Sequence, residues 1–131
     1  MLIEVLQHGD VCVLRLRGRS ATGADLIYLE DKLHEIRNHS ASKMLVDLSG
    51  LTSIGSTGLG FIVSVFRSVV SRPYGRFIVA GPTPRVRKVL DVTRLSEIIP
   101  ITADVDSALL RLRGGYLEFQ AFGARSGTAA Y

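Results

Sequence analysis

The chain has 131 residues, of which 47% are hydrophobic and 21% are charged, a balance typical of one globular domain with its own core. The formal net charge is +4, but the basic residues are scattered rather than gathered in one stripe with stacking aromatics, which argues against direct nucleic-acid binding. Cys12 is the only cysteine, so an internal disulfide is excluded, and its valine neighbours predict a buried structural thiol.

The N-terminal sequence lacks the pattern of an export signal, because Glu4 stands where such a signal carries positive charge. The longest apolar run ends at Arg67 and is too short to cross a bilayer. We therefore expect a cytoplasmic protein with no membrane partner.

Two strand-like segments open the chain. In residues 2–6 and 11–17, apolar side chains alternate with polar ones or are β-branched, which is typical of strands. The turn between the two segments contains Gly9, so together they predict a β-hairpin. After a polar loop, residues 25–38 place apolar side chains at helical spacing. Residues 43–48 form a short apolar run, which indicates a buried strand.

The second half of the chain alternates helices and strands. Residues 59–70, 83–93 and 104–113 are predicted helices. Residues 75–81 and 98–101 are predicted strands. Pro84, just after Thr83, marks a helix start, and Asp104 is the expected cap of the last helix. The order is ββαβαβαβα, which predicts an α/β domain with a mixed, mostly parallel sheet and helices packed beside it.

The helical periodicity also predicts which side chains face the sheet. They are Leu26, Leu29, Leu33, Ile62, Val63, Phe66, Val89 and Leu90, which should face a sheet that includes residues 43–48 and 75–80. Leu59, Val69 and Val70 are placed on the same helical face as Ile62. We expect residues 1–113 to form the domain and residues 114–131 to be a C-terminal tail. Residues 123–131 are small and polar and should be dispensable, whereas the apolar residues of 114–122 could dock on the domain or on a neighbouring chain.

The common catalytic patterns are missing. Ile54 stands where a Gly-x-Ser-x-Gly nucleophile elbow needs its first glycine, and no phosphate loop, complete dinucleotide fingerprint or metal-ligand spacing occurs. The three histidines, His8, His34 and His39, are expected on the surface. The sequence therefore predicts a protein that is not an enzyme and has no cofactor and no metal.

The stretch LTSIGSTGLG places Ser56 and Thr57 between Gly55 and Gly58, where a strand gives way to a helix. Taken alone, this pattern favours Ser56 as a helix N-cap. We expect Ser56 to be exposed in the first turn, with Thr57, Gly58 and Leu59 on the same exposed rim.

Two longer stretches, MLVDLSGLTSIGSTGLGFIVSVFR and FIVAGPTPRVRKVLDVTRLSEIIPITADVDSAL, resemble the STAS domain of bacterial anti-sigma factor antagonists. The resemblance covers roughly residues 2–112 and combines the VDLSG strand end, the Ser-Thr-Gly-Leu-Gly helix start and the late DVDSAL helix. It implies the STAS fold, a mixed sheet beside packed helices.

The resemblance also implies a mechanism. An anti-sigma factor that is also a serine kinase would phosphorylate Ser56, and only the unphosphorylated protein would bind that kinase and free the sigma factor. A metal-dependent serine phosphatase would reset the switch. Residues 55–59 would form the partner-binding surface. The acids that the family carries before the serine and in the loop after the second strand are replaced here by Gly55 and Ala21.

Two alternatives stay open. One is an unswitched STAS scaffold or adaptor, and the other is a small-ligand or nucleotide binder that uses Asp47 and the loop 81–85. The sequence also leaves a homodimer open.

Overall fold

The computed structural model describes residues 1–19, 22–39 and 41–113. The expectations for Ala21 and for the tail 114–131 therefore lie outside the described residues.

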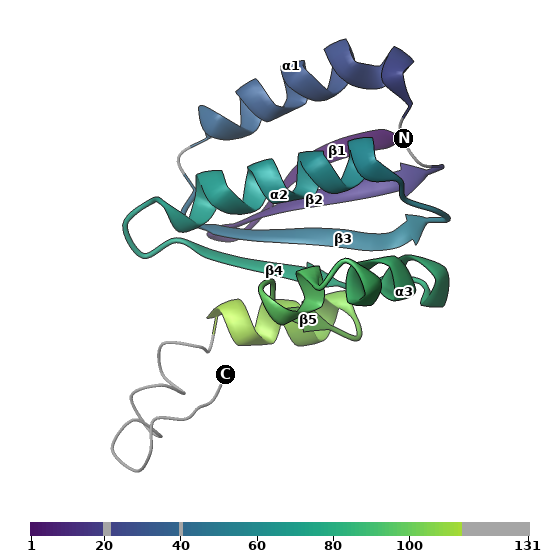
Figure 1. The fold of residues 1–131 in the computed structure, drawn as a ribbon. Coiled ribbons are helices and arrows are strands. Elements are labelled where there is room, and N and C mark those ends of the chain that lie inside the picture. The colour runs from purple at the N-terminus through teal and green to yellow at the C-terminus, as the bar shows by residue number, and fades with distance from the viewer. Residues whose placement is uncertain (20–21, 40, 114–131) are drawn as a thin grey trace.

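The described residues form the predicted succession of elements (Figure 1). In chain order they are β1 (Leu2–His8), β2 (Val11–Gly18), η1 (Gly23–Asp25), α1 (Leu26–Arg37), β3 (Lys43–Leu51), α2 (Ser56–Val70), β4 (Arg76–Ala80), α3 (Pro84–Val92), η2 (Leu95–Glu97), β5 (Ile101–Thr102) and a helix over residues 105–113, called the C-terminal helix below. The order ββαβαβαβα is confirmed.

Within the described ranges the strands form one five-stranded sheet in the order β1-β2-β3-β4-β5. β1 and β2 are antiparallel, and each later neighbour pair is parallel. The predicted hairpin is confirmed, and Gly9 in its turn has φ +66°, a left-handed value that glycine adopts without strain.

The sheet is covered on both faces (Figure 1). The larger core lies under α1, α2 and α3 and includes Cys12, which is buried and free, as predicted. The second core joins the opposite face to the C-terminal helix through Val11, Val13, Leu45, Ile78, Ala80, Ala108, Leu109 and Leu112. Burial raises the pKa of the Cys12 thiol, as expected for a structural rather than a reactive cysteine.

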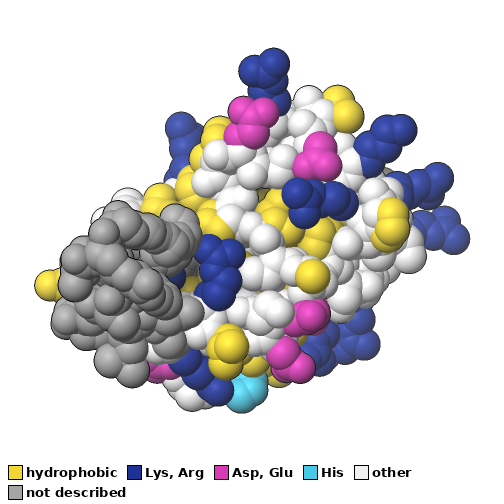
Figure 2. Space-filling model, turned by 90° about the horizontal axis from the view of Figure 1, so that it is seen from below, with side chains coloured by type: hydrophobic (Ala, Val, Ile, Leu, Met, Phe, Trp, Pro, Cys, Tyr) yellow, Lys and Arg dark blue, Asp and Glu magenta, His cyan; other side chains and the backbone are white. Residues whose placement is uncertain are grey.

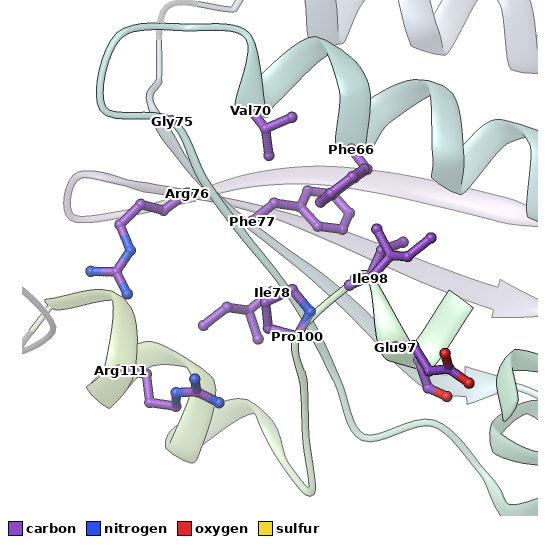
Figure 3. Close-up of a pocket in the computed structure, with 12 residues that line it drawn as sticks. Phe66, Val70, Gly75, Arg76, Phe77, Ile78, Glu97, Ile98, Pro100 and Arg111 are labelled. Atoms are coloured by element: carbon purple, nitrogen blue, oxygen red, sulfur yellow. The ribbon is translucent and has the colours of Figure 1, made fainter. Parts of the chain in front are cut away.

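Some sequence predictions about packing were wrong. Leu26, predicted to face the sheet, is 51% exposed, because it lies on the rim of a surface groove. Val70, expected on the same helical face as the buried Ile62, is 44% exposed on the rim of another groove, beside β4 (Figure 3). The strand predicted at 98–101 is shorter and lies later, as β5 at Ile101–Thr102. The helical turn η2 ends just before Ile98 and leaves that residue 64% exposed.

None of the helices in the described ranges is long and apolar enough to cross a membrane.

A pair of isoleucines tests the packing of the helices. Ile62 of α2 is fully buried, so Ile62→Ala should lower the free energy of unfolding by roughly 2–5 kcal/mol in a urea melt. Ile27 of α1 is 73% exposed, and Ile27→Ala should change it by less than about 0.5 kcal/mol. Equal effects of the two substitutions would contradict this arrangement of helices.

Candidate functional site

The loop after β3 lies at the carboxyl ends of the parallel strands and is tied to its neighbours. Thr52 donates both its backbone N–H and its hydroxyl to the carbonyl of Gly18 at the end of β2, at 2.8 and 3.0 Å. Thr83, just before α3, donates its hydroxyl to the carbonyl of Leu51, at 3.4 Å. These contacts fix the point from which α2 starts.

The structure corrects the role expected for Ser56. The N-cap of α2 is Gly55, whose backbone is extended and whose carbonyl accepts the first helical hydrogen bond from Leu59, at 2.9 Å. Ser56 is already the first helical residue, and Gly55, the N-cap residue, makes no side-chain capping hydrogen bond. The exposed hydroxyl of Ser56 is therefore not committed to capping α2.

The residues around Ser56 differ in exposure. Ser56 is exposed as expected, but Thr57 and Leu59 are half-buried and Gly58 is buried, so the predicted common rim is wrong for them. A Cβ atom at Gly58 would lie 2.9 Å from Cγ1 of Ile54, which is itself buried. Because Gly58 has no side chain, the first turn of α2 can pack closely against the loop that precedes it.

Ser56 also lines a groove of about 330 Å³ between α1 and α2. Its lining comes from Leu26, Leu29, Glu30 and Leu33 of α1, and from Ser56, Thr57, Gly60, Phe61 and Ser64 of α2. The sequence analysis missed this groove, although the small residues at positions 56, 60 and 64 recur every four residues and mark one face of a helix. An apolar side chain of a partner could lie in this groove next to the Ser56 hydroxyl.

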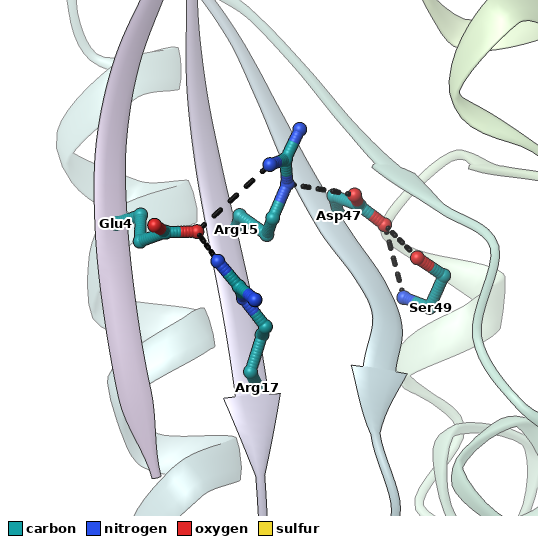
Figure 4. A network of polar contacts seen from close by, with 5 residues as sticks. All are labelled: Glu4, Arg15, Arg17, Asp47 and Ser49. Atoms are coloured by element: carbon teal, nitrogen blue, oxygen red, sulfur yellow. Dashed lines mark hydrogen bonds and ion pairs between the residues drawn. The ribbon is translucent and has the colours of Figure 1, made fainter.

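A network of polar contacts joins β1, β2 and β3 (Figure 4). The carboxylate of Asp47, only 4% exposed, accepts from the backbone N–H and the hydroxyl of Ser49, at 2.9 and 2.7 Å. Nε of Arg15 lies 3.5 Å from its other oxygen. Glu4 pairs with both Arg15 and Arg17, and the hydrogen bond from Arg17 lowers the pKa of the Glu4 carboxyl. Asp47 is therefore engaged inside the protein rather than presented to a ligand.

The N-terminus of α2 favours negative charge at Ser56, while Glu30 of α1 lines the same groove. Ser56 occupies the N-terminus of a 15-residue helix, where the helix dipole is positive, and the first turn of α2 has no acidic residue. The hydroxyl thus stands where a phosphate group would be tolerated by the domain itself.

Comparison with known proteins gives a consistent picture. The family model described as STAS domain matches residues 3–108. A candidate anti-sigma factor antagonist from Thermotoga neapolitana is 38% identical over 80 residues, which cover 61% of this chain and 70% of that protein. The anti-sigma F factor antagonist of Paenibacillus polymyxa is 26% identical over 111 residues, which cover 84% of this chain and 93% of that protein.

The fold is also that of the anti-sigma factor antagonist SpoIIAA from Bacillus. Its unphosphorylated form has a TM-score of 0.71 and 23% identity, and the match covers 86% of this chain and 97% of SpoIIAA. Its phosphorylated form has a TM-score of 0.63 and 21% identity, and the match covers 86% of this chain and 100% of SpoIIAA.

Ser56→Ala tests whether the serine is a cap. Because Gly55 holds the N-cap position, the substitution should change the free energy of unfolding by less than about 0.5 kcal/mol. Thr83, whose hydroxyl accepts from the N–H of Val86, is the matched capping residue of α3. Thr83→Ala should cost roughly 0.5–2 kcal/mol in the same urea melt. A loss at Ser56 as large as that at Thr83 would restore the capping role.

The two glycines of the α2 start should respond in opposite directions to alanine. Gly58→Ala forces a methyl group against Ile54 and should destabilise the protein by roughly 1–3 kcal/mol. A Cβ atom at Gly60 meets nothing within 4 Å, so Gly60→Ala should stabilise it by about 0.5–1 kcal/mol through helix propensity. Thermal unfolding of both variants measures the difference, and a stable Gly58→Ala protein would show that the contact with Ile54 is unimportant.

Proposed function

Because the chain belongs to the STAS-domain family, with relatives named as anti-sigma factor antagonists, we propose that it binds an anti-sigma factor and is released by phosphorylation of Ser56. In this proposal the partner is also the serine kinase, and a serine phosphatase restores the binding form. The protein is then a cytoplasmic regulator of sigma-factor-dependent transcription that acts by binding and not as an enzyme.

The observation that carries the switch is the placement of the Ser56 hydroxyl. It is exposed, lies at the N-terminus of α2 and is not used as a cap. A phosphate there adds about −1.5 to −2 charge, which the helix dipole accommodates within the domain. Phosphorylation would therefore leave the fold intact and alter only the surface that a partner meets.

The groove between α1 and α2 supports a way in which the phosphate acts. Leu26, 51% exposed, and the half-buried Leu33 give the groove an apolar wall beside Ser56. A partner that packs apolar side chains against this wall and against residues 55–59 would have to remove water from the phosphate without pairing its charge. Such desolvation is unfavourable, so the phosphorylated protein would bind weakly.

One feature favours the unswitched scaffold as a second candidate. Gly55 takes the place of the acid that the resemblance leads one to expect before the serine, so a basic kinase surface would lose one charged contact there. The small-ligand alternative gains no such support, because Asp47 is held by Ser49 and Arg15.

Charge substitution at Ser56 separates the switched protein from the scaffold. Ser56→Asp should weaken binding to the anti-sigma factor kinase of the same organism at least roughly tenfold in calorimetry, because it places negative charge on the contact surface. Ser56→Ala should keep binding but abolish incorporation of phosphate from ATP.

Ser107→Asp is the matched control, since Ser107 is exposed in the first turn of the C-terminal helix, and it should bind like the unmodified protein. If Ser56→Asp binds as tightly as Ser107→Asp and the kinase leaves Ser56 unmodified, the switch is excluded and the scaffold function takes its place.

A further inference from the structure

Helix α3 presents to solvent a face that carries both positive charge and an apolar side chain. Val86 and Leu90 are buried under the helix, whereas Arg85, Lys88 and Val92 are exposed. The three exposed residues follow one another at spacings of three and four positions, so they lie on one face of the helix. They are called the basic face of α3 below. Val92 is 74% exposed, so an apolar contact is available beside the two cations.

The two cations of this face are not neutralised within the domain. On the same helix, Nε of Arg87 lies 3.0 Å from the carboxylate of Asp91, and this pair cancels its own charge. Within the described ranges, no acidic group pairs with Arg85 or Lys88. Exposed charges of one sign that are left unpaired attract a surface of the opposite sign.

The chain that connects Ser56 to this face contains no acid. From residue 48 to residue 90 the sequence has no aspartate and no glutamate. Asp47 and Asp91 border this stretch, and each of them contacts an arginine. The loop before α2, the whole of α2 and most of α3 therefore contribute only neutral and basic side chains to the surface.

Other acids of the domain lie on other elements. Glu30 lines the groove beside Ser56 but belongs to α1, which lies on the side of α2 away from α3 (Figure 1). Asp104 and Asp106 lie at the start of the C-terminal helix, which packs on the opposite face of the sheet from α3. A partner that spans the starts of α2 and α3 thus meets no carboxylate on those two helices before Asp91.

The basic face lies at the same end of the sheet as Ser56. β3 and β4 are neighbouring parallel strands, so α2 and α3, which follow them, begin at the same edge (Figure 1). The hydroxyl of Thr83 donates to the carbonyl of Leu51 at 3.4 Å and ties the two helix starts together. Figure 2 shows basic side chains projecting at the right-hand end of the molecule, the end where the parallel strands finish in Figure 1. A partner that covers Ser56 can therefore also reach α3.

A third cation follows α3 in a strained conformation. Arg94 has φ +63°, a left-handed value, directly after the C-cap Thr93, at a position where helices usually carry glycine. Its side chain is exposed, and no acid within the described ranges pairs with it. Backbone strain of this kind clusters at functional sites, where the side chain is kept for its contacts.

We propose that the basic face of α3, together with Arg94, binds an acidic surface of the anti-sigma factor that also covers Ser56. The inference rests on the proposed function and adds the chemistry of the partner, which presents carboxylates to Arg85 and Lys88 and an apolar side chain to Val92. The cations attract and align that surface on approach. A phosphate on Ser56 then faces the same acidic partner, so repulsion between like charges contributes to release.

Charge reversal tests this surface in the full chain. Arg85→Glu combined with Lys88→Glu should weaken binding to the anti-sigma factor kinase of the same organism at least roughly tenfold in calorimetry. The remaining affinity should fall less with added salt than that of the unmodified protein, because salt screens attraction between opposite charges. Both substitutions are at exposed positions, so the unfolding temperature should stay the same.

Arg37→Glu combined with Arg67→Glu is the matched control. It changes the net charge by the same amount at exposed positions of α1 and α2, near the helix ends that lie away from Ser56. This control should bind like the unmodified protein and keep its salt dependence. The comparison separates the local effect of α3 from the effect of total charge.

Arg94→Gly separates binding from stability. Glycine adopts the left-handed value without strain, so the variant should unfold at an equal or higher temperature. It also removes a cation from the surface, so it should bind the anti-sigma factor kinase several-fold more weakly. Unchanged affinity of this variant would overturn the role given to Arg94.

Two results would overturn the proposal as a whole. One is a double α3 variant that binds as tightly as the control while Ser56→Asp still loses binding, since the proposed function would then stand without an acidic partner surface. The other is an unchanged affinity for the kinase together with lost binding to duplex DNA or to phosphatidylglycerol vesicles, since the face would then serve a nucleic acid or a membrane. If the unmodified protein does not bind the kinase at all, the proposed function itself fails, and the acidic partner fails with it.

Discussion

The arrangement of this domain depends on β3, the central strand of the sheet, which is buried on both faces. Met44, Val46 and Leu48 pack under the helices of the larger core, while Leu45 faces the C-terminal helix. The register of β3 in its parallel pairing with β2 and β4 is fixed, because a shift of one residue would turn the carboxylate of Asp47 toward the larger core. The position of the end of β3, and with it the start of α2, follows from this packing.

The geometry at the start of α2 then explains why the Ser56 hydroxyl is not used as a helix cap. The close contact between Gly58 and Ile54 holds the first turn against the loop, and the chain enters the helix through Gly55 rather than through a capping side chain. The first N–H groups of a helix have no partner within the helix, and the N-cap residue of α2, Gly55, has no side chain with which to satisfy them. A phosphate on Ser56 would bring acceptor oxygens to that terminus, so modification could replace the missing cap even as it alters the binding surface.

The sequence was sufficient for the features that depend on periodicity and turn chemistry. The hairpin at Gly9, the helix start at Thr83 and Pro84, and the cap at Asp104, whose carboxylate accepts from the N–H of Ser107 at 2.7 Å, were all predicted from local pattern. Features that depend on how elements meet were not. Serine is a preferred N-cap, so local pattern assigned that position to Ser56, one residue too late, whereas the packing of Gly58 against Ile54 sets the helix start at Gly55.

The same limit explains the errors on exposure. Helical spacing assigned Leu26 to the face that includes Leu29 and Ile36, but it carries no information about the groove that opens between α1 and α2. The residues around Ile98 are apolar enough for a strand. However, the residues just before Ile98 form the helical turn η2, and pairing with β4 starts only at Ile101. In both cases tertiary contacts decided what the local pattern could not.

Helix α2 lines the groove beside Ser56 near its start and the groove beside β4 near its end. Ser56 lies at its first residue and Val70 at its last, so the rise of the helix puts them about 21 Å apart. At physiological ionic strength the screening length is about 8 Å, so charge added at Ser56 has little direct effect on the groove beside β4. A fixed core between the two surfaces transmits no rearrangement unless α2 itself moves, and Ile62, Val65 and Val69 are all fully buried along it. Under the proposed function, phosphorylation of Ser56 would therefore act on the surface at the start of α2 and leave the groove beside β4 unchanged.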